Sequence, residues 1–383
     1  MIHVLHITTV PKSLRFIQGQ IPFMNQRNVS LSFATSSAAE LDHFKQLTEA
    51  KVYTIEMPRK ISPLADLKAV VKLTQLILTL KPDIIHAHTP KGGLLGMLAA
   101  TLCNHPARVY HMRGLPFMTA TGAKRLLLTL TEAISCTCSH QTICVSNSLR
   151  EVALSHRLIP DTKIKVMAGG SGQGVDALQR FHPDNYSAEQ RHTLRTSLGI
   201  PEDATVIGFI GRLVRDKGVC ELAQAWETLH TQYPNAHMVC VGDFEERDPV
   251  PDHVQQQLAN LPRLHMVGWR ENTPDYYNIM DIVTLPTYRE GFPNVPLEAA
   301  AMALPVVATH IPGCVDAVQD GVTGILVPSK NTNALQEALA LYLEDEERRL
   351  RDGQAGRSRV LAHFLPEQIF QDIYTTYQSL MTR

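Results

Sequence analysis

Two glutamates frame the stretch YREGFPNVPLEA. Glu290 and Glu298 lie eight positions apart, with a glycine, two prolines and an asparagine between them. Pro296 suits the first turn of a helix, because its missing N–H has no partner to lose there, and LEAAAMAL then continues the helix. Asn294 is expected to cap this helix. One glutamate is therefore predicted on the loop entering a helix and the other in the first turn.

This arrangement favours a phosphorylated ligand. The start of a helix presents free backbone N–H groups and partial positive charge, which suit a phosphate. A carboxylate beside it can accept hydrogen bonds from neutral hydroxyls, such as those of a ribose. The pattern predicts a nucleotide-sugar pocket. The alternative is that the spacing arises by chance and that Glu298 only complements the helix dipole.

A second motif lies upstream, in TVIGFIGRLVRDKGVCELAQAW. Its first residues, Val206 to Ile210, form an apolar run typical of a buried parallel strand, and a helical pattern follows Gly218. Ligands of open α/β sheets bind beyond the carboxyl ends of the strands, where the intervening loop would lie. Arg212 can grip a phosphate with two hydrogen bonds, and Lys217 can add a point charge. The alternative is a pair of solvated surface cations.

These motifs, taken in order, resemble a known family. Strand–GRLVRDKG–helix, EGFPNVPLEAAAMALPVVAT and GCVDAVQDGVTGILVP resemble the retaining GT-B glycosyltransferases of the GT4 type. The first half adds IIHAHTPKGGLLGMLAA, RVYHMRGLPF and TICVSNSLREVAL. That set is similar to the bacterial branch that acts on polyprenyl-diphosphate-linked sugars, such as undecaprenyl diphosphate carriers, in capsule, lipopolysaccharide O-antigen and glycan-precursor synthesis.

The resemblance implies roles for the motif residues. Arg212 and Lys217 would bind the donor's diphosphate and stabilise the charge that develops as the sugar departs. Glu298 would hold the ribose hydroxyls. Glu290 would hold the donor sugar and the distal phosphate, together with backbone N–H groups near Phe292, Pro293, Asn294 and Val295. Retention of anomeric configuration would proceed by front-face attack, with the leaving phosphate oxygen taking the acceptor's proton.

The first half departs from the family pattern at Arg113. Many relatives carry a histidine before the glycine at this place, in contact with the donor sugar. Arg113 could instead bind a phosphate of donor or acceptor, or His111 could take over the sugar contact. His86 and His88 flank the end of another strand, and Lys91, in the loop after it, suits an acceptor diphosphate. Either histidine could equally be a packed, hydrogen-bonded residue.

Other donor-site candidates rest on position alone. Gly19 is expected on the loop after the first strand, where relatives bring backbone close to the donor phosphate. Gly211 and Gly242 follow two strands of the second half, and Trp269 is expected to border the base pocket. The branch mostly uses UDP-sugars, which implies a uracil base.

Apolar runs predict the elements that must position these residues. Six runs precede residue 175 and six follow it, separated mostly by amphipathic segments. We therefore expect an α/β protein of the GT-B type, with two Rossmann-like doubly wound parallel sheets facing a central cleft. The predicted units are residues 1–180 for the acceptor, residues 181–365 for the donor, and a helix at 366–383 that crosses back to the first unit.

Charge differs between the halves. Residues 1–175 carry 19 Lys and Arg against 9 Asp and Glu, a net charge of +10, and the remainder carries 17 against 28, or −11. A basic first half suits a lipid diphosphate and anionic headgroups. The segment KRLLLTLTEAIS, residues 124–135, is the better candidate for membrane contact, whereas GGLLGMLAATLC, residues 92–103, is expected to be a core helix. We expect a cytoplasmic protein held peripherally on the inner face of the bacterial membrane, without nucleic acid.

No metal or cofactor is expected. No DxD motif occurs in the chain, so the two cations near residue 215 would replace a divalent ion on the diphosphate. Cys136, Cys138, His140 and Cys144 are close in sequence, but their spacing is not a standard zinc pattern. Seven cysteines in such an enzyme are expected to be free thiols.

Rival functions share this architecture. A nonhydrolysing UDP-sugar epimerase needs no acceptor and hence no HTPKGGLLG stretch. An inactive sugar-nucleotide-binding scaffold would have little reason to keep both cations and both glutamates. Glycogen- or sucrose-type transferases use soluble acceptors. A dinucleotide dehydrogenase is disfavoured, because no GxGxxG follows the first strand. The sugar transferred, whether a hexose or an N-acetylhexosamine, is not encoded in these motifs.

Overall fold

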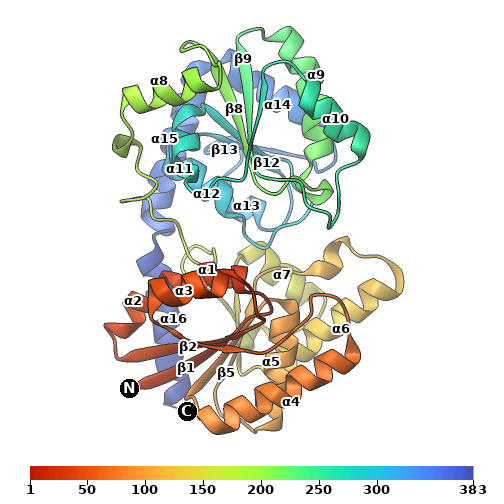
Figure 1. The fold of residues 1–383 in the computed structure, drawn as a ribbon, viewed down its shortest axis with the longest axis vertical. Helices are drawn as coiled ribbons and strands as arrows, with labels where there is room; N and C mark the ends of the chain where they lie inside the picture. The colour runs from red at the N-terminus through yellow and green to blue at the C-terminus, as the bar shows by residue number, and fades with distance from the viewer. Residues whose placement is uncertain (383) are drawn as a thin grey trace. The chain divides into compact units, whose positions relative to one another are not determined.

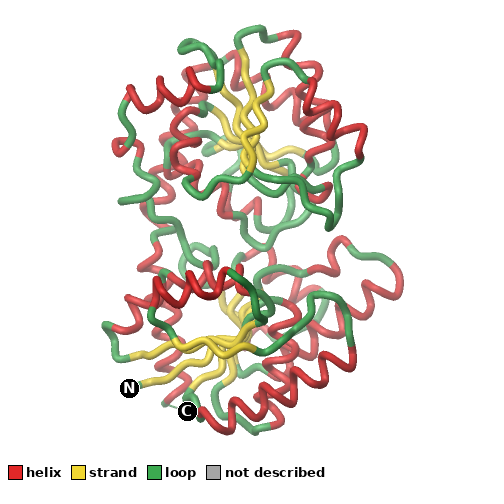
Figure 2. Tube along the Cα trace, viewed as in Figure 1, coloured by secondary structure: helices red, strands yellow, loops and turns green. Residues whose placement is uncertain are grey.

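The computed structural model describes residues 1–382, without the side chain of Glu40. The chain forms two compact units (Figures 1 and 2). The first contains residues 1–174 and the segment from Pro366 onward, and the second runs from Val175 to Leu365. The predicted boundary at residue 180 lies too far along the chain. Val175 donates a backbone hydrogen bond to Phe364 and belongs to the core of the second unit.

The first unit is built on one parallel sheet. Its order is β3-β2-β1-β4-β5-β6-β7. The strands are β1 Ile2–Ile7, β2 Val29–Thr35, β3 Lys51–Thr54, β4 Ile84–His88, β5 Arg108–Met112, β6 Gln141–Cys144 and β7 Ile164–Val166. All six predicted strands are present, and edge strand β3 is additional. The sequence pattern missed β3 because KVYT is short and lacks a fully buried face.

Helices cover both faces of this sheet. They are α1 Arg15–Gln18, α2 Gln20–Asn25, α3 Glu40–Thr48, α4 Pro63–Leu80, α5 Pro90–Leu102, α6 Gly122–Cys138, α7 Asn147–Ser155 and α16 Pro366–Met381. Right-handed crossovers place α4, α5 and α6 together on one face, with α5 in contact with both neighbours. Helix α16 packs on the other face with α1 and α2. Helix α5 is largely buried, as predicted for a core helix.

The second unit repeats this architecture. Its parallel sheet has the order β10-β9-β8-β11-β12-β13. The strands are β8 Thr205–Ile210, β9 Ala236–Val241, β10 Leu264–Gly268, β11 Ile282–Leu285, β12 Val306–Thr309 and β13 Gly324–Val327. The helices are α8 Ala188–Ser197, α9 Val219–Gln232, α10 Asp252–Asn260, α11 Thr273–Ile279, α12 Asn294–Ala301, α13 Cys314–Ala317, α14 Thr332–Glu344 and α15 Glu346–His363. All six strands match predicted apolar runs. No helix among residues 1–382 is long and apolar enough to cross a membrane.

A buried ion pair ties α8 to the central strands of the second unit. The fully buried Arg195 donates to Asp281 at 2.9 Å and to backbone carbonyl oxygens, including that of Ala204 at 2.9 Å. Asp281 also accepts from the backbone N–H of Val206, at the start of β8, at 2.7 Å. Arg191 reaches the same carboxylate at 2.8 Å from a more exposed position. This network anchors the strand that leads to Arg212.

Arg195→Met should lower the free energy of unfolding of the second unit by about 3 kcal/mol or more, because it leaves buried acceptors without a donor. Arg191→Met is the matched control, and about 1 kcal/mol is expected for its partly exposed pair. Urea unfolding followed by tryptophan fluorescence measures both, since the two tryptophans, Trp226 and Trp269, lie in this unit. Equal losses for the two variants would contradict a structural role for the buried network.

Candidate active site

The loop after β8 brings Lys217 to the segment after β11. Residues Arg215–Lys217 form one 3-10 turn, and α9 begins directly after Gly218. Gly218 has φ 72°, and a side-chain carbon there would lie 2.0 Å from the carbonyl oxygen of Pro286. Only glycine allows this close approach. The Thr287 hydroxyl and the Tyr288 N–H both donate to the carbonyl of Asp216, at 3.0 and 2.8 Å.

An ion pair between Lys217 and Glu290 results from this approach. The Lys217 ammonium donates to the Glu290 carboxylate, and only 18% and 14% of the two side chains are exposed. The thiol of Cys314 is buried beside the pair, and burial, then the charge of Glu290, raises its pKa. The two predicted motifs, about seventy residues apart, are thus joined by opposite charges at a mostly buried position.

Arg212 lies in a more open setting. Its guanidinium donates to the Glu245 carboxylate at 2.9 Å, and 48% of its side chain is exposed. Sequence analysis missed Glu245, because nothing in its neighbourhood marks it as the partner of a residue 33 positions earlier. Both predicted diphosphate cations therefore hold a carboxylate that an anionic ligand would share or displace.

Glu298 is half-buried in α12, and its hydrogen-bond partner was also missed. The Tyr277 hydroxyl donates to Glu298 at 2.9 Å. Burial raises the pKa of Glu298, and the hydrogen bond from Tyr277 opposes that rise. Buried tyrosine hydroxyls usually need a partner, and this was the available signal for Tyr277.

The start of α12 differs from the prediction in two details. Asn294 is the first helical residue, and Pro293 occupies the N-cap position with no side-chain cap. The predicted asparagine cap is therefore wrong. Pro296 does lie in the first turn, but Glu298 is the fifth residue of the helix, in its second turn. The first-turn amides of Asn294 and Val295 remain suitable donors to an anion.

Gly242 follows β9, and Trp269 follows β10. A side-chain carbon at Gly242 would lie 1.9 Å from the carbonyl oxygen of Gly211, so the chain ends of β8 and β9 approach closely. The backbone N–H of Trp269 donates to the Asp243 carboxylate at 3.0 Å, and Trp269 is 52% exposed. The exposed ring is available to stack on a planar group. Phe292 is half-buried and packs against the core of the unit.

In the first unit, Gly19 does not lie on an open loop. It joins α1 to α2 with the helical φ of −63°, and Phe370 of α16 packs against it. A side-chain carbon there would be 3.3 Å from the Phe370 ring. The predicted loop position is therefore wrong, because the chain after β1 turns into short helices instead.

His88 and His111 are buried in a stack of histidines. His6, His86, His88 and His111 come from β1, β4 and β5 and face α16, where the Tyr377 hydroxyl bonds His86 at 2.5 Å. Ring centroids of neighbours in the stack are 4.2 to 5.3 Å apart. Burial lowers the pKa of all four, that of His6 to about 3. Neutral rings therefore form this layer.

Arg113 sets the direction of hydrogen bonds in the stack. Its Nε–H donates to Nδ1 of His88 at 3.4 Å, so Nε2 of His88 carries the proton and donates to His6 at 2.8 Å. The guanidinium also lies over the Phe16 ring, 5.1 Å from its centroid. A side-chain carbon at Gly172 would be 2.2 Å from the Arg113 Nη1, so this glycine, missed from the sequence, gives the arginine its room.

Burial lowers the pKa of Arg113 to about 9, which still leaves it a cation at neutral pH. Arg113 keeps partial exposure, whereas His111 is 1% exposed and neither of its ring nitrogens has a hydrogen-bond partner among the described residues. Of the two candidates for the missing family histidine, Arg113 is the one that a ligand could reach.

Lys91 already has partners. Its ammonium lies 2.7 Å from Asp66 and donates to backbone carbonyls of Pro58 and Lys60. It holds the loop before α4 to the start of α5. An acceptor diphosphate would have to compete with these contacts.

The possible metal ligands do not include the cysteine-rich segment. Within residues 1–382, the group close enough to hold an ion is His6, His86 and His88, whose ligand atoms lie within 4.8 Å of one another. The guanidinium of Arg113 beside His88 would repel a divalent cation. Cys136, Cys138 and Cys144 form no disulfide among the described residues.

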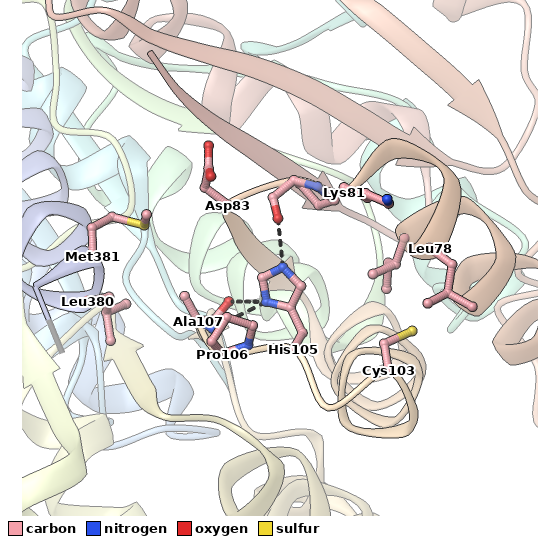
Figure 3. A pocket seen from close by; sticks show the side chains of 11 residues that line it. Leu78, Lys81, Asp83, Cys103, His105, Pro106, Ala107, Leu380 and Met381 are labelled. Carbon is pink, nitrogen blue, oxygen red and sulfur yellow. Dashed lines mark hydrogen bonds between the residues drawn. The ribbon is translucent and has the colours of Figure 1, made fainter.

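A pocket of about 400 Å³ in the first unit lies elsewhere (Figure 3). It is lined by the end of α4, the turns before β4 and β5, and the end of α16. The ring of His105 within it is bonded to Pro82 at 2.8 Å and to Ala107. The pocket is at the amino ends of β4 and β5, whereas His88 and Arg113 lie at their carboxyl ends. It is therefore separate from the candidate site.

Comparison with known proteins decides the family. Residues 204–345 match the family described as glycosyl transferases group 1, and residues 7–148 match glycosyl transferase 4-like. The chain is 32% identical to the capsular polysaccharide biosynthesis glycosyltransferase CapM of Staphylococcus aureus, over 99% of this chain and 97% of that protein. The chain belongs to the group 1, GT4-type glycosyltransferases.

Other relatives agree with this glycosyltransferase assignment. An Escherichia coli enzyme named UDP-Gal:alpha-D-GlcNAc-diphosphoundecaprenol alpha-1,3-galactosyltransferase is 28% identical over 75% of this chain and 73% of its own. A glycosyltransferase structure from Rickettsia africae has a TM-score of 0.82 at 18% identity, covering 100% and 99% of the two chains. Anabaena HepE with UDP has a TM-score of 0.81 at 22% identity, covering 99% of each. The two parallel-sheet units are those of the predicted GT-B fold.

Lys217→Ala should lower kcat/KM of this glycosyltransferase by about 10²–10³-fold, because it removes a cation positioned for developing negative charge. Lys217→Arg keeps the charge and should lose less. Sugar-nucleotide turnover measures both. Arg215→Ala is the matched control, since Arg215 is exposed in the same turn and should leave activity unchanged. Equal losses for Arg215→Ala and Lys217→Ala would contradict the assigned role.

His111→Phe should weaken the acid sensitivity of the first unit. Below about pH 6.5 these histidines bind protons in the unfolded chain, whereas in the folded chain their buried rings stay neutral. The free energy of unfolding therefore decreases as the pH falls below that value. Replacing one such ring should reduce the slope of unfolding free energy against pH by about 1.4 kcal/mol per pH unit. Phenylalanine keeps the stacking, and His111 has no hydrogen bonds to lose.

Urea unfolding followed by circular dichroism between pH 4.5 and 6.5 measures this slope, given these histidines' ordinary pKa of about 6.5. Tryptophan fluorescence, confined to the second unit, supplies an internal reference. His253→Phe, at an exposed position, is the matched control and should leave the slope unchanged. An unaltered slope in His111→Phe would show that this ring is charged or solvated in the folded chain.

Proposed function

We propose that this glycosyltransferase moves a hexose or N-acetylhexosamine from a UDP-sugar to a polyprenyl-diphosphate-linked saccharide, with retention of anomeric configuration. The pathway class would be bacterial surface-polysaccharide synthesis, on the cytoplasmic face of the membrane. The observation that carries this proposal is the Lys217–Glu290 pair, which joins a phosphate-suited cation to a hydroxyl-suited carboxylate. The name of the relative from Escherichia coli supports the lipid-linked acceptor.

The donor's diphosphate would take the place of the carboxylates that now hold the two cations. Lys217 would turn from Glu290 to a phosphate oxygen, and Arg212 would leave the exposed Glu245. Glu290, released from its partner, would then accept hydrogen bonds from hydroxyls of the donor sugar. The two ion pairs hold the side chains of Lys217 and Arg212 in place, which would reduce the ordering needed on binding.

Glu298 would accept hydrogen bonds from the ribose hydroxyls. The hydrogen bond from Tyr277 uses one of its lone pairs and fixes the carboxylate, while other lone pairs remain for the ligand. The amides of Asn294 and Val295 at the start of α12 would face a phosphate. The exposed indole of Trp269 would stack on the uracil base.

The transfer itself needs no protein base. The bond between the anomeric carbon and the leaving phosphate oxygen breaks, and a bond forms to the acceptor oxygen on the same face. The acceptor proton passes to the leaving phosphate oxygen. Lys217 and Arg212 stabilise the charge on the released UDP, a positioning and electrostatic contribution. We propose that no metal ion is required, with Arg113 as the first unit's cation for a phosphate of donor or acceptor.

UDP release from a panel of UDP-sugars, with and without a synthetic polyprenyl-diphosphate-linked sugar, tests this proposal. We expect release from one donor only when the lipid acceptor is present, and undiminished release in EDTA. Nuclear magnetic resonance of the product should show the donor's anomeric configuration. The Lys217→Ala variant gives the background rate of UDP release.

Other outcomes would overturn the proposal in defined ways. Conversion of a UDP-sugar to its epimer without acceptor would identify an epimerase. Donor binding without turnover on any acceptor would identify a scaffold. Loss of activity in EDTA, restored by a divalent ion, would reject the metal-independent mechanism.

A further inference from the structure

Two helices of the first unit expose apolar side chains that no part of their unit covers. On α4, Leu64, Leu67, Val71 and Leu78 are 79%, 62%, 49% and 57% exposed. Their spacing of three, four and seven residues places them on one side of the helix. A stripe of this kind on a free helix surface is unusual, because exposed apolar groups are normally scattered singly.

Helix α6 repeats the pattern. Leu126, Leu127, Leu130 and Ile134 are 63%, 42%, 52% and 41% exposed. This helix and α4 flank the largely buried α5 on the same face of the sheet, and Figure 1 shows all three in one layer. Both apolar stripes therefore belong to one side of the first unit, which we call the α4–α6 face.

The charges on this face have one sign. Lys68 and Lys72 on α4, and Lys124 and Arg125 on α6, are exposed. The two helices contain one carboxylate each, and both are turned inward. Asp66 pairs with Lys91 at 2.7 Å, and the buried Glu132 accepts from Tyr110 at 2.7 Å. Every exposed charged side chain on α4 and α6 is thus a cation.

We propose that the α4–α6 face docks on the surface of an anionic lipid bilayer. The exposed leucines of this face would enter the boundary between headgroups and acyl chains, and the cations would reach lipid phosphates. A protein partner fits less well, since lysine is depleted from the cores of protein interfaces. Long lysine stems can lie along apolar surface while the ammonium stays in water. The inference rests on the proposed function in one respect, since the lipid-linked acceptor gives the enzyme a reason to dock on a membrane. The α4–α6 face itself is defined by the exposed residues of the two helices.

Vesicle flotation of the full chain tests the docking. We expect binding to vesicles of phosphatidylcholine with about one-third phosphatidylglycerol, and much weaker binding to pure phosphatidylcholine. Binding should fall in about 0.5 M NaCl, where charges are screened beyond a few ångströms. The variant Lys68→Gln/Lys72→Gln/Lys124→Gln/Arg125→Gln should lower the partition coefficient at least tenfold, since each basic residue near the surface contributes about fivefold.

Matched variants separate this face from charge or hydrophobicity in general. Leu126→Ser/Leu130→Ser should weaken flotation, whereas Leu341→Ser/Leu350→Ser, equally exposed on α14 and α15, should not. Lys51→Gln/Lys165→Gln, at exposed positions on strands β3 and β7, is the charge control. Failure of the wild-type chain to float, or equal loss in face and control variants, would overturn the proposal. A change in the oligomeric mass in solution of the leucine variants would also overturn it, because the face would then be an interface between copies of the chain.

Turnover of a detergent-dispersed acceptor keeps the two proposals distinguishable. The face variants contain no residue of the candidate site, so they should keep this turnover while losing flotation. Turnover without any vesicle binding would leave the proposed function intact and reject the docking face. Vesicle binding without turnover would do the reverse.

Discussion

The second unit depends on how closely its strand ends approach one another. At Gly218 and at Gly242, backbone carbonyl oxygens occupy the space that a side chain would need. These contacts bring the loops after β8, β9 and β11 within reach of side chains from one another. Lys217 then meets Glu290, and Arg212 meets Glu245, although each pair is far apart in sequence. The parallel sheet supplies the common edge, and the glycines allow its loops to close on it.

The two units hold their cations by different means. In the second unit, each cation predicted to bind phosphate forms an ion pair with a carboxylate, which the proposed donor would replace. In the first unit, Arg113 has no carboxylate partner among the described residues and lies against neutral histidine rings, Phe16 and Gly172. Burial already lowers its pKa, so an approaching phosphate would gain a cation that is poorly compensated by the protein. The proposed role of this arginine as an anion site would therefore depend on its surroundings.

The structure also shows where the positive charge of the first unit lies. Some of the excess Lys and Arg residues in residues 1–175 form internal contacts, as Lys91 does with Asp66. Other cations gather with leucines on α4 and α6, where the only carboxylates are turned inward. The mean properties of the chain are those of an ordinary protein, with a net charge of −1. An amphipathic surface of one charge sign is visible only after the helices are placed.

The sequence by itself determined twelve of thirteen strands, the GT-B architecture and the two motifs that meet at Lys217 and Glu290. Periodic apolar runs and glycines at strand ends are local signals, and they are sufficient for these features. Only the tertiary structure decided what depends on strand order. His6 pairs with His86, eighty residues away, because β1 and β4 are neighbours. The histidine stack, the room for Arg113 at Gly172, and the partners Tyr277 and Glu245 arise from such distant neighbours, which no local pattern encodes.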